Sequence, residues 1–416
     1  MPMGADIKVA VTGTGAVTAA GVGVAALDAL VTETPVNLAR RHASISDIAI
    51  YSTPPFNLAE SLQMSGIAAE AVHVLAKTAH RRPPGYAWAV AAAAQAWQQA
   101  NAFAAPLPPE RVGLIIGGSN LNGSEHAEIA TGAVVVRPSW AVQFMDTDLV
   151  GCISEALNIR GEGFSVGGAS ASGSVALIQG ARLIQSGAVD ACLVVGVAPC
   201  LSTAEFDAFM QAGAMAQGDV DGIVRNHPFD QTHRGFVFGE GAGAMLLESV
   251  DSAEKRNRPL CGLLTGSAFR LAAHRFTTPC ADTEARVMQH AIESAGLQSS
   301  AVDFISAHGT GSPLGDAVEL EAIGQVFKAA KIPVNSAKSW IGHTLSASGI
   351  IESIMTLRQL ARGQIHPTRH LQSPLETPGC LLNDTAIFGN FSHALKNSFG
   401  FSGINTSILW SKGNDA

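Results

Sequence analysis

Charged residues are scarce in this 416-residue sequence, and acidic side chains outnumber basic ones. They make up 14% of the chain and leave a net charge of −8, which argues against a nucleic-acid-binding protein because such a protein needs a basic face. Long apolar runs are also missing. The most apolar helix candidate, residues 87–105, contains Gln and Asn and does not predict a membrane span. Residues 1–15 lack the apolar run of a signal peptide.

Cysteine is sparse and scattered. The six cysteines form no Cys-x-x-Cys pair and no His/Cys cluster with metal-ligand spacing, so the sequence predicts neither a zinc site nor a disulfide framework. Free thiols are typical of a reducing compartment, and we expect a cytoplasmic protein without a bound metal. The positions concerned are Cys152, Cys192, Cys200, Cys261, Cys280 and Cys380.

Apolar residues make up 47% of the sequence, enough to bury a large core in one large domain or two fused halves. Short β-rich runs alternate with helical stretches, which predicts an α/β protein with a mostly parallel sheet. The polar, Pro-containing stretch Val250–Leu260 divides the two predicted halves, residues 1–250 and 251–416. Predicted strands include residues 7–12, 112–116 and 191–197, and predicted helices include residues 24–32, 84–101 and 172–186.

The segment 163–196 reads as a short strand, a small-residue turn, a helix and a buried strand. Ser170 lies where that helix begins. A side chain at this place experiences the positive end of the helix dipole and unpaired backbone N–H groups, which suit an anion. The alternative is that Ser170 or Ser172 only caps the helix.

Histidines follow two further strand-like segments. His308 is followed by a Gly-rich loop that carries Thr310 and Ser312, and the adjoining helix begins with Asp316 and Glu319, which we expect to serve as capping and dipole groups. The carboxyl edge of a parallel sheet is where α/β proteins build their sites, so a histidine there is a candidate for catalysis.

The other histidine, His343, lies in a small-residue stretch that also contains Lys338, and Glu352 on the next helix can fold back to pair with this lysine. Two histidines from separate loops can each donate Nε2–H to one carbonyl oxygen and stabilise an enolate. The spacing fits no metal motif. Close to the C-terminus, a Gly-rich segment around Phe401 predicts either a pocket border or a tight turn before the last strand.

These motifs, taken in order, resemble one family. The N-terminal VAVTGTGAVTAAG, the central PFDQTHRGFVFGEGAGAMLLES (residues 228–249) and the C-terminal NSFGFSGINTS are similar to the β-ketoacyl synthases, which condense acyl thioesters with malonyl-carrier protein. The resemblance covers essentially the whole chain. It implies a thiolase-like, duplicated five-layer αβαβα fold, a homodimer, an acyl carrier protein as partner, and a substrate carried on the phosphopantetheine arm rather than a bound cofactor.

The resemblance also assigns roles to single residues. His308 and His343 match the two catalytic histidines of the family, and Lys338 matches the lysine of its K-S-x-x-G-H motif. Glu352 lies where the partner of that lysine is found. Phe401 matches the gating aromatic, whose N–H also serves the oxyanion hole.

The sequence departs from the family where it matters most. Ser170 stands where the family has its nucleophilic cysteine, whereas Thr310 and Ser312 match the hydroxyls that hold the phosphopantetheine arm. A thiol is readily activated by a helix N-terminus, but a serine hydroxyl needs a positioned base. With the histidines kept and the thiol lost, the half-reaction that remains is decarboxylation. Such serine variants resemble the decarboxylases of polyketide β-branching cassettes, so our leading prediction is a malonyl-[acyl-carrier-protein] decarboxylase.

Alternatives remain open. Ser170 could act as the nucleophile of a β-ketoacyl synthase or acyltransferase, with His343 as its base. A non-catalytic chain-length partner of a heterodimeric synthase typically lacks the histidines, and plain thiolase chemistry needs a second catalytic cysteine. An acidic chain also needs a local basic patch to dock an acidic carrier protein. Lys77, Arg81 and Arg82 form the candidate patch, with an ordinary solvated turn as the alternative.

Overall fold

A computed structural model describes residues 7–32, 38–41, 48–55, 57–133, 135–217, 225–328, 330–377 and 379–414. The strands before residue 250 are β1 (Val9–Thr18), β2 (Gly21–Val22), β3 (Ala39–Arg41), β4 (Ala49–Tyr51), β5 (Val112–Gly117), β6 (Gly163–Val166), β7 (Ala191–Val197) and β8 (Gly241–Ser249). The strands after it are β9 (Gly262–Leu271), β10 (Phe304–Ser306), β11 (Ile332–Asn335), β12 (Gln364–Ile365), β13 (Cys380–Leu382), β14 (Ile387–Phe388), β15 (His393–Gly400) and β16 (Ile404–Lys412).

Helices connect these strands in both parts of the chain. The first series is α1 (Val24–Thr32), α2 (Leu58–Met64), α3 (Ala69–Thr78), α4 (Pro84–Gln99), α5 (Gly123–Ala130), α6 (Trp140–Gln143), α7 (Thr147–Leu157), α8 (Ser172–Gln185) and α9 (Thr203–Gln211). The second series is α10 (Val250–Lys255), α11 (Ala281–Ser294), α12 (Pro313–Phe327), α13 (Lys338–Ile341) and α14 (Ser348–Arg362). In the part of the chain described, no helix is long and apolar enough to cross a membrane.

The strands before and after residue 250 repeat one order. The first set runs β6-β5-β7-β8-β1 and the second runs β11-β10-β15-β16-β9, with β13 beyond β11. The sets meet where β1 pairs with β9. The α/β class is thereby confirmed, but the sheet is mixed rather than mostly parallel: β16 follows β15 through a turn of three residues, which can only form an antiparallel hairpin. The division of the chain at residue 250 stays a prediction.

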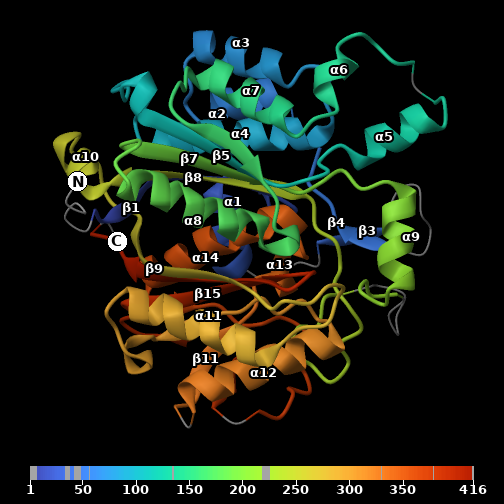
Figure 1. Cartoon of the computed structure of the whole chain (residues 1–416), viewed down its shortest axis with the longest axis vertical. Helices are drawn as coiled ribbons and strands as arrows, with labels where there is room; N and C mark the ends of the chain where they lie inside the picture. Colours follow the sequence, from blue (N-terminus) through green and yellow to red (C-terminus); the bar gives the residue numbers. More distant parts are fainter. Residues whose placement is uncertain are drawn as a thin grey trace.

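Helices lie on both faces of the strand sets, which gives the layered arrangement visible in Figure 1. Helices α2, α3, α4 and α7 cover the outer face of the first set, and α11 and α12 cover the outer face of the second. Helices α8 and α14 lie between the two sets and pack against each other. The central layer is therefore enclosed on both sides by sheet.

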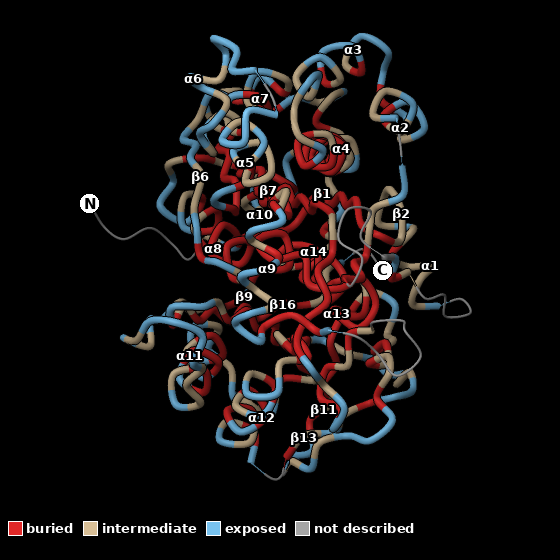
Figure 2. The backbone as a smooth tube through the Cα atoms, turned by 90° about the vertical axis from the view of Figure 1, so that its right-hand side faces the viewer, coloured by how far each residue is buried: buried red, intermediate tan, exposed pale blue. Residues whose placement is uncertain are grey.

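Burial follows this layering. The core between the sheets packs aliphatic residues of α8 and α14 against strands of both sets, and the helix residues include Ile178, Ile350 and Ile354. In Figure 2 the tube of α14, β1 and β16 is buried, while α11, α12, α2 and α3 keep exposed outer sides. Because α8 and α14 are packed between the two sets of strands, the turns that precede them are suited to hold reactive groups rigidly.

Candidate active site

Ser170 lies in a short 3₁₀ turn, Ala169–Ala171, between β6 and α8. Ala169 has a φ of 49°, a left-handed conformation that is strained for a residue with a Cβ. The turn is held by Ser172, whose hydroxyl accepts from Gly168 N at 2.9 Å and donates to Ala169 O at 2.7 Å. The capping alternative is therefore wrong for both serines: the N-cap of α8 is Ala171, and no side chain caps it.

The side chain of Ser170 is directed to His343, whose Nε2 lies 2.9 Å from the serine Oγ. Nδ1 of the same ring accepts a hydrogen bond from Leu345 N at 3.3 Å and lies 2.9 Å from Ser348 Oγ. A backbone N–H can only donate, so Nδ1 of a neutral His343 is the acceptor and the proton resides on Nε2. His343 therefore presents an N–H donor toward Ser170.

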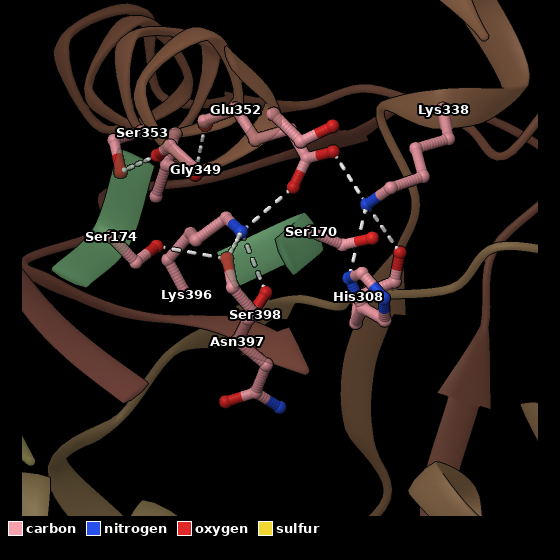
Figure 3. Close-up of polar contacts among 12 residues, drawn as sticks. Ser170, Ser174, His308, Lys338, Gly349, Glu352, Ser353, Lys396, Asn397 and Ser398 are labelled. Atoms are coloured by element: carbon pink, nitrogen blue, oxygen red, sulfur yellow. Dashed lines mark hydrogen bonds and ion pairs between the residues drawn. The ribbon is translucent and has the colours of Figure 1, made fainter. Parts of the chain in front are cut away.

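His308 is oriented by a lysine. Lys338 Nζ donates to His308 O at 2.6 Å and lies 3.3 Å from His308 Nδ1, so this ring also presents Nε2–H when neutral. Glu352 holds the lysine, with 2.5 Å between Lys338 Nζ and Glu352 Oε1, as the sequence predicted (Figure 3). The rings of His308 and His343 meet edge to face with centroids 5.5 Å apart.

Both histidines are neutral at physiological pH. Burial lowers the pKa of His308 and His343 well below the ordinary value, and the positive charges of Lys338 and Lys396 lower it further; His343 adds to the effect on His308. The site therefore offers two uncharged N–H donors, which suit an oxygen that becomes negative during reaction.

Sequence reasoning missed Lys396, which lies on β15 and is fully buried. Its ammonium lies 2.7 Å from Glu352 Oε2, so two lysines share one carboxylate (Figure 3). It also donates to Asn397 O at 2.6 Å and to Ser398 Oγ. Burial is the main cause that lowers the pKa of Lys396 to about 8. No sequence pattern distinguishes such a lysine from one on the surface.

The predicted capping role of Asp316 and Glu319 is wrong, because Ser312 is the N-cap of α12, whereas Asp316 does lie in the first turn of that helix. The Glu319 carboxylate accepts the backbone N–H of His308 at 2.8 Å and that of Gly309 at 2.7 Å. Asp316 accepts Gly311 N at 3.0 Å in the same loop. The two acids thus hold the histidine loop on α12, a role that depends on loop geometry the sequence does not reveal.

The turn that carries Phe401 packs closely against the turn that carries Ser170. A Cβ at Gly400 would approach Gly168 O to 2.6 Å, so only glycine allows this contact. Phe401 is 37% exposed, and the next residue, Ser402, donates its N–H to Phe276 O at 2.8 Å. The aromatic side chain is therefore placed at a pocket border, as one of the two sequence interpretations predicted.

Most of the predicted site residues line one cavity of about 690 Å³. Thr310 and Ser312 line it, but the Ser312 hydroxyl also caps α12 by accepting Gly315 N at 3.4 Å. The predicted residues that border this cavity are Ser170, His308, Thr310, Ser312, His343 and Phe401. Lys338 and Glu352 lie behind the histidines and support them. Within the described ranges no group of His, Cys, Asp or Glu could hold a metal ion.

Glu284 is a second residue that the sequence did not reveal. It lies on α11, lines the cavity and is 1% exposed, with Oε2 free of any hydrogen-bond partner. Burial and then the neighbouring Glu319 raise the pKa of Glu284 well above its ordinary range, which favours the protonated form of its carboxyl group. A protonated carboxyl group can donate a proton or a hydrogen bond inside the cavity.

The candidate docking residues lie outside the cavity lining. Lys77, in the last turn of α3, and Arg81 are exposed. Arg82 is different, because its Nε lies 3.3 Å from Asp148 Oδ2 and its side chain is 17% exposed. Because Arg82 forms this largely buried ion pair, only Lys77 and Arg81 of the predicted patch are exposed.

Two sets of strands with the same order, and two histidine donors that line one cavity together with a serine at a helix start, define a thiolase-like enzyme. Residues 6–253 match the beta-ketoacyl synthase N-terminal domain, and residues 261–372 match its C-terminal domain. The chain therefore belongs to the β-ketoacyl synthase family.

Individual relatives include a protein named as a decarboxylase and others named as synthases. The chain is 35% identical over 320 residues to "Polyketide biosynthesis malonyl-ACP decarboxylase PksF" of Bacillus subtilis (strain 168), which covers 76% of each protein. It is 29% identical over 423 residues to "3-oxoacyl-[acyl-carrier-protein] synthase 2" of Staphylococcus aureus (strain MRSA252), which covers 99% of each.

Solved structures confirm the thiolase-like fold. A beta-ketoacyl synthase from Burkholderia phymatum STM815 superposes with a TM-score of 0.85 at 27% identity, over 98% of this chain and 99% of that one. The ishigamide ketosynthase/chain length factor gives a TM-score of 0.82 at 25% identity, over 98% and 100%.

Proposed function

We propose that this protein decarboxylates malonyl-[acyl-carrier protein] to acetyl-[acyl-carrier protein] in polyketide biosynthesis. The observation that carries the proposal is the pairing of an intact two-histidine donor site with Ser170 in place of a thiol. The similarity to the PksF decarboxylase supports the same reaction.

In the proposed mechanism the malonyl group stays on the sulfur of the phosphopantetheine arm, which passes Thr310 and Ser312 on its way to the histidines. The thioester oxygen accepts Nε2–H from His308 and from His343. As the carbon–carbon bond to the carboxylate breaks, CO₂ leaves and the bonding electrons form an enolate whose negative oxygen strengthens both hydrogen bonds. The enolate carbon then takes up one proton to give the acetyl thioester.

Ser170 has a supporting role in this mechanism. The His343 tautomer set by Leu345 N–H makes Nε2 a donor to Ser170 Oγ and not a base toward it. The serine hydroxyl is then a small neutral group that keeps the donor oriented when the site is empty. A reaction that never transfers the acyl group needs no nucleophile at this position.

The proposal is tested by incubating the purified protein with malonyl-carrier protein and weighing the carrier by intact mass spectrometry. We expect the carrier to lose the mass of CO₂ and to retain an acetyl group. A carrier that keeps its malonyl group, or that loses the whole acyl group to the enzyme, would contradict the proposal.

The second candidate is acyl transfer with Ser170 as the nucleophile of a synthase or acyltransferase. The distance of 2.9 Å between Ser170 Oγ and His343 Nε2 is the observation in its favour, because a serine needs a base within hydrogen-bond reach, but this role requires the other tautomer of His343, with the proton on Nδ1. The similarity to 3-oxoacyl-[acyl-carrier-protein] synthase 2 points the same way. A non-catalytic chain-length subunit, a further alternative, is not supported because both histidines are present and directed to one cavity.

We also propose a homodimer. Strand β6 is the last strand at its end of the described sheet, and Phe164 on it is 38% exposed. Further exposed apolar side chains lie nearby in sequence on and beside α6, namely Val136, Val142, Phe144 and Met145. An open strand edge and exposed apolar side chains both favour pairing with a second copy. Sedimentation equilibrium would show a monomer if this is wrong.

A cytoplasmic location is proposed because all six cysteines are free thiols.

Carrier docking is expected to depend on Lys77 and Arg81. Replacing both with Glu should lower kcat/KM for malonyl-carrier protein about tenfold, since charge complementarity acts on the encounter rate. A small malonyl thioester should be turned over as before. An equal loss with both substrates would mean that the segment is structural, and no loss would place the docking surface elsewhere.

A further inference from the structure

Beneath the two histidines, one carboxylate is shared by two buried ammonium groups. Lys338 Nζ lies 2.5 Å from Glu352 Oε1, and Lys396 Nζ lies 2.7 Å from Glu352 Oε2 (Figure 3). The two lysine side chains are 0% exposed and that of Glu352 is 2% exposed. The cluster is shielded from bulk solvent, so each charge acts strongly on its neighbours.

The charges in this cluster do not balance. Lys338 and Glu352 alone would make a neutral pair, and Lys396 adds one positive charge to it. A buried positive charge in excess is costly, so the cluster favours any arrangement that brings a negative charge close, and Glu319 is one carboxyl group that acts on Lys396 in this way. His308, which Lys338 contacts directly, is the group through which the cluster faces the cavity.

Lys396 also connects the cluster to the helix that follows Ser170. Its ammonium donates to Ser398 Oγ. The Ser398 hydroxyl is in turn hydrogen-bonded to the Ser174 hydroxyl on α8, with 2.8 Å between the two oxygens. The neighbouring Asn397 donates to Glu319 Oε1 at 3.2 Å, and Glu319 holds the backbone of the His308 loop. Lys396 is thus connected through Ser398 to helix α8, which follows Ser170, and through Asn397 to Glu319, which holds the His308 loop.

We propose that Lys396 is a positioning residue that, through Glu352 and Lys338, holds His308 and His343 as neutral donors and adds positive charge that stabilises the developing enolate. This inference rests on the proposed decarboxylation for its effect on rate, but the effect on the histidines does not.

The direction of the pH dependence follows from the charges that face Lys396. Burial lowers the pKa of Lys396 to about 8, Lys338 lowers it, and Glu352 and Glu319 raise it. Below pH 8 the ammonium is charged and the cluster carries its extra positive charge; above pH 8 that charge is lost. We therefore expect decarboxylation to fall as the pH rises through about 8. The groups that face Lys396 are Glu352 from α14, Lys338 from α13, Glu319 from α12, and the rings of His308 and His343.

The test uses Lys396→Met, which keeps the volume and removes the charge, with Ser398→Ala as the control that removes a contact of Lys396 and keeps the charge. Wild type and both variants are assayed with malonyl-carrier protein from pH 6 to pH 10. We expect Lys396→Met to lose about tenfold in rate at neutral pH, less than the loss of a direct donor, and to lose the fall near pH 8. Ser398→Ala should keep that fall.

A second readout needs no turnover. In protein labelled with ¹⁵N in its histidine rings, NMR titration reports when His308 and His343 become protonated, and we expect both to protonate at a higher pH in Lys396→Met. If this shift is seen but wild type does not decarboxylate, the proposed function fails and the positioning role stands. If the rate profile and the titrations match wild type, or if the variant is only less stable, the inference is overturned. Should Lys396→Met not fold, Lys396→Gln takes its place.

Discussion

His308→Ala and His343→Ala are each expected to lose decarboxylation of malonyl-carrier protein by about a hundredfold or more, because each removes one donor to the enolate oxygen. Ser170→Ala, in the same assay, should retain activity within several-fold, since a hydrogen bond of the neutral hydroxyl contributes only about 1 kcal/mol. The three residues border one cavity, so the comparison separates the donors from the serine within a single site.

The comparison is read from initial rates of CO₂ release at saturating and at low carrier concentration. If the loss lies in kcat, the histidines act on the enolate; a loss in KM alone would place them in substrate binding. Ser170→Ala falling as far as the histidine variants would show that the hydroxyl takes part in the chemistry, and the transferase would then be the better description.

The largest effect on stability is expected from Glu352→Gln. This change leaves the ammonium groups of Lys338 and Lys396 buried without their shared carboxylate. Breaking a buried ion pair by removing one partner typically costs about 3–5 kcal/mol, and we expect a loss of this order in the free energy of unfolding, measured by urea denaturation.

Asp28 supplies a matched control, because it also binds two cations, at 2.8 Å to Arg358 and at 3.3 Å to Arg362. These arginines are 42% and 37% exposed, so solvent replaces the lost contacts and Asp28→Asn should cost no more than about 1 kcal/mol. Equal, small losses in both variants would mean that the Glu352 cluster does not carry the buried charges inferred from its contacts.

Much of the fold could be predicted from periodicity. The predicted helix 24–32 and the predicted strand 191–197 coincide with α1 and β7, because both have apolar spacing typical of their class and small or polar residues at their ends. The predicted helix 172–186 differs from α8 by one residue. Such elements are specified locally.

Strand β15 could not be predicted in the same way. Its residues Lys396, Asn397 and Ser398 are polar yet fully buried, and a polar segment rich in Gly and Ser reads as a turn. It is a strand because β10 and β16 pair with it on either side and because Glu352, distant in sequence, receives the lysine. The interaction that stabilises it is tertiary.

In the site, too, some residues could be predicted from local sequence and others depend on tertiary contacts. The motif order identified Ser170, His308 and His343, and the structure brings them to one cavity. The orienting groups were misread or missed: Glu319 reads as a helix-start acid but accepts two N–H groups of the histidine loop, and Glu284 carries no local signature at all. Their roles depend on burial and on contacts between α11, α12 and the loop, none of which periodicity encodes.

The central claim, decarboxylation without acylation of the enzyme, is tested most directly by weighing both proteins. Purified enzyme and malonyl-carrier protein are mixed, quenched at short times and measured by intact mass spectrometry, with peptide mapping of the segment that holds Ser170. We predict that the carrier passes from malonyl to acetyl while the mass of the enzyme never changes. An enzyme that gains an acyl group on Ser170 at a rate matching turnover would contradict this account.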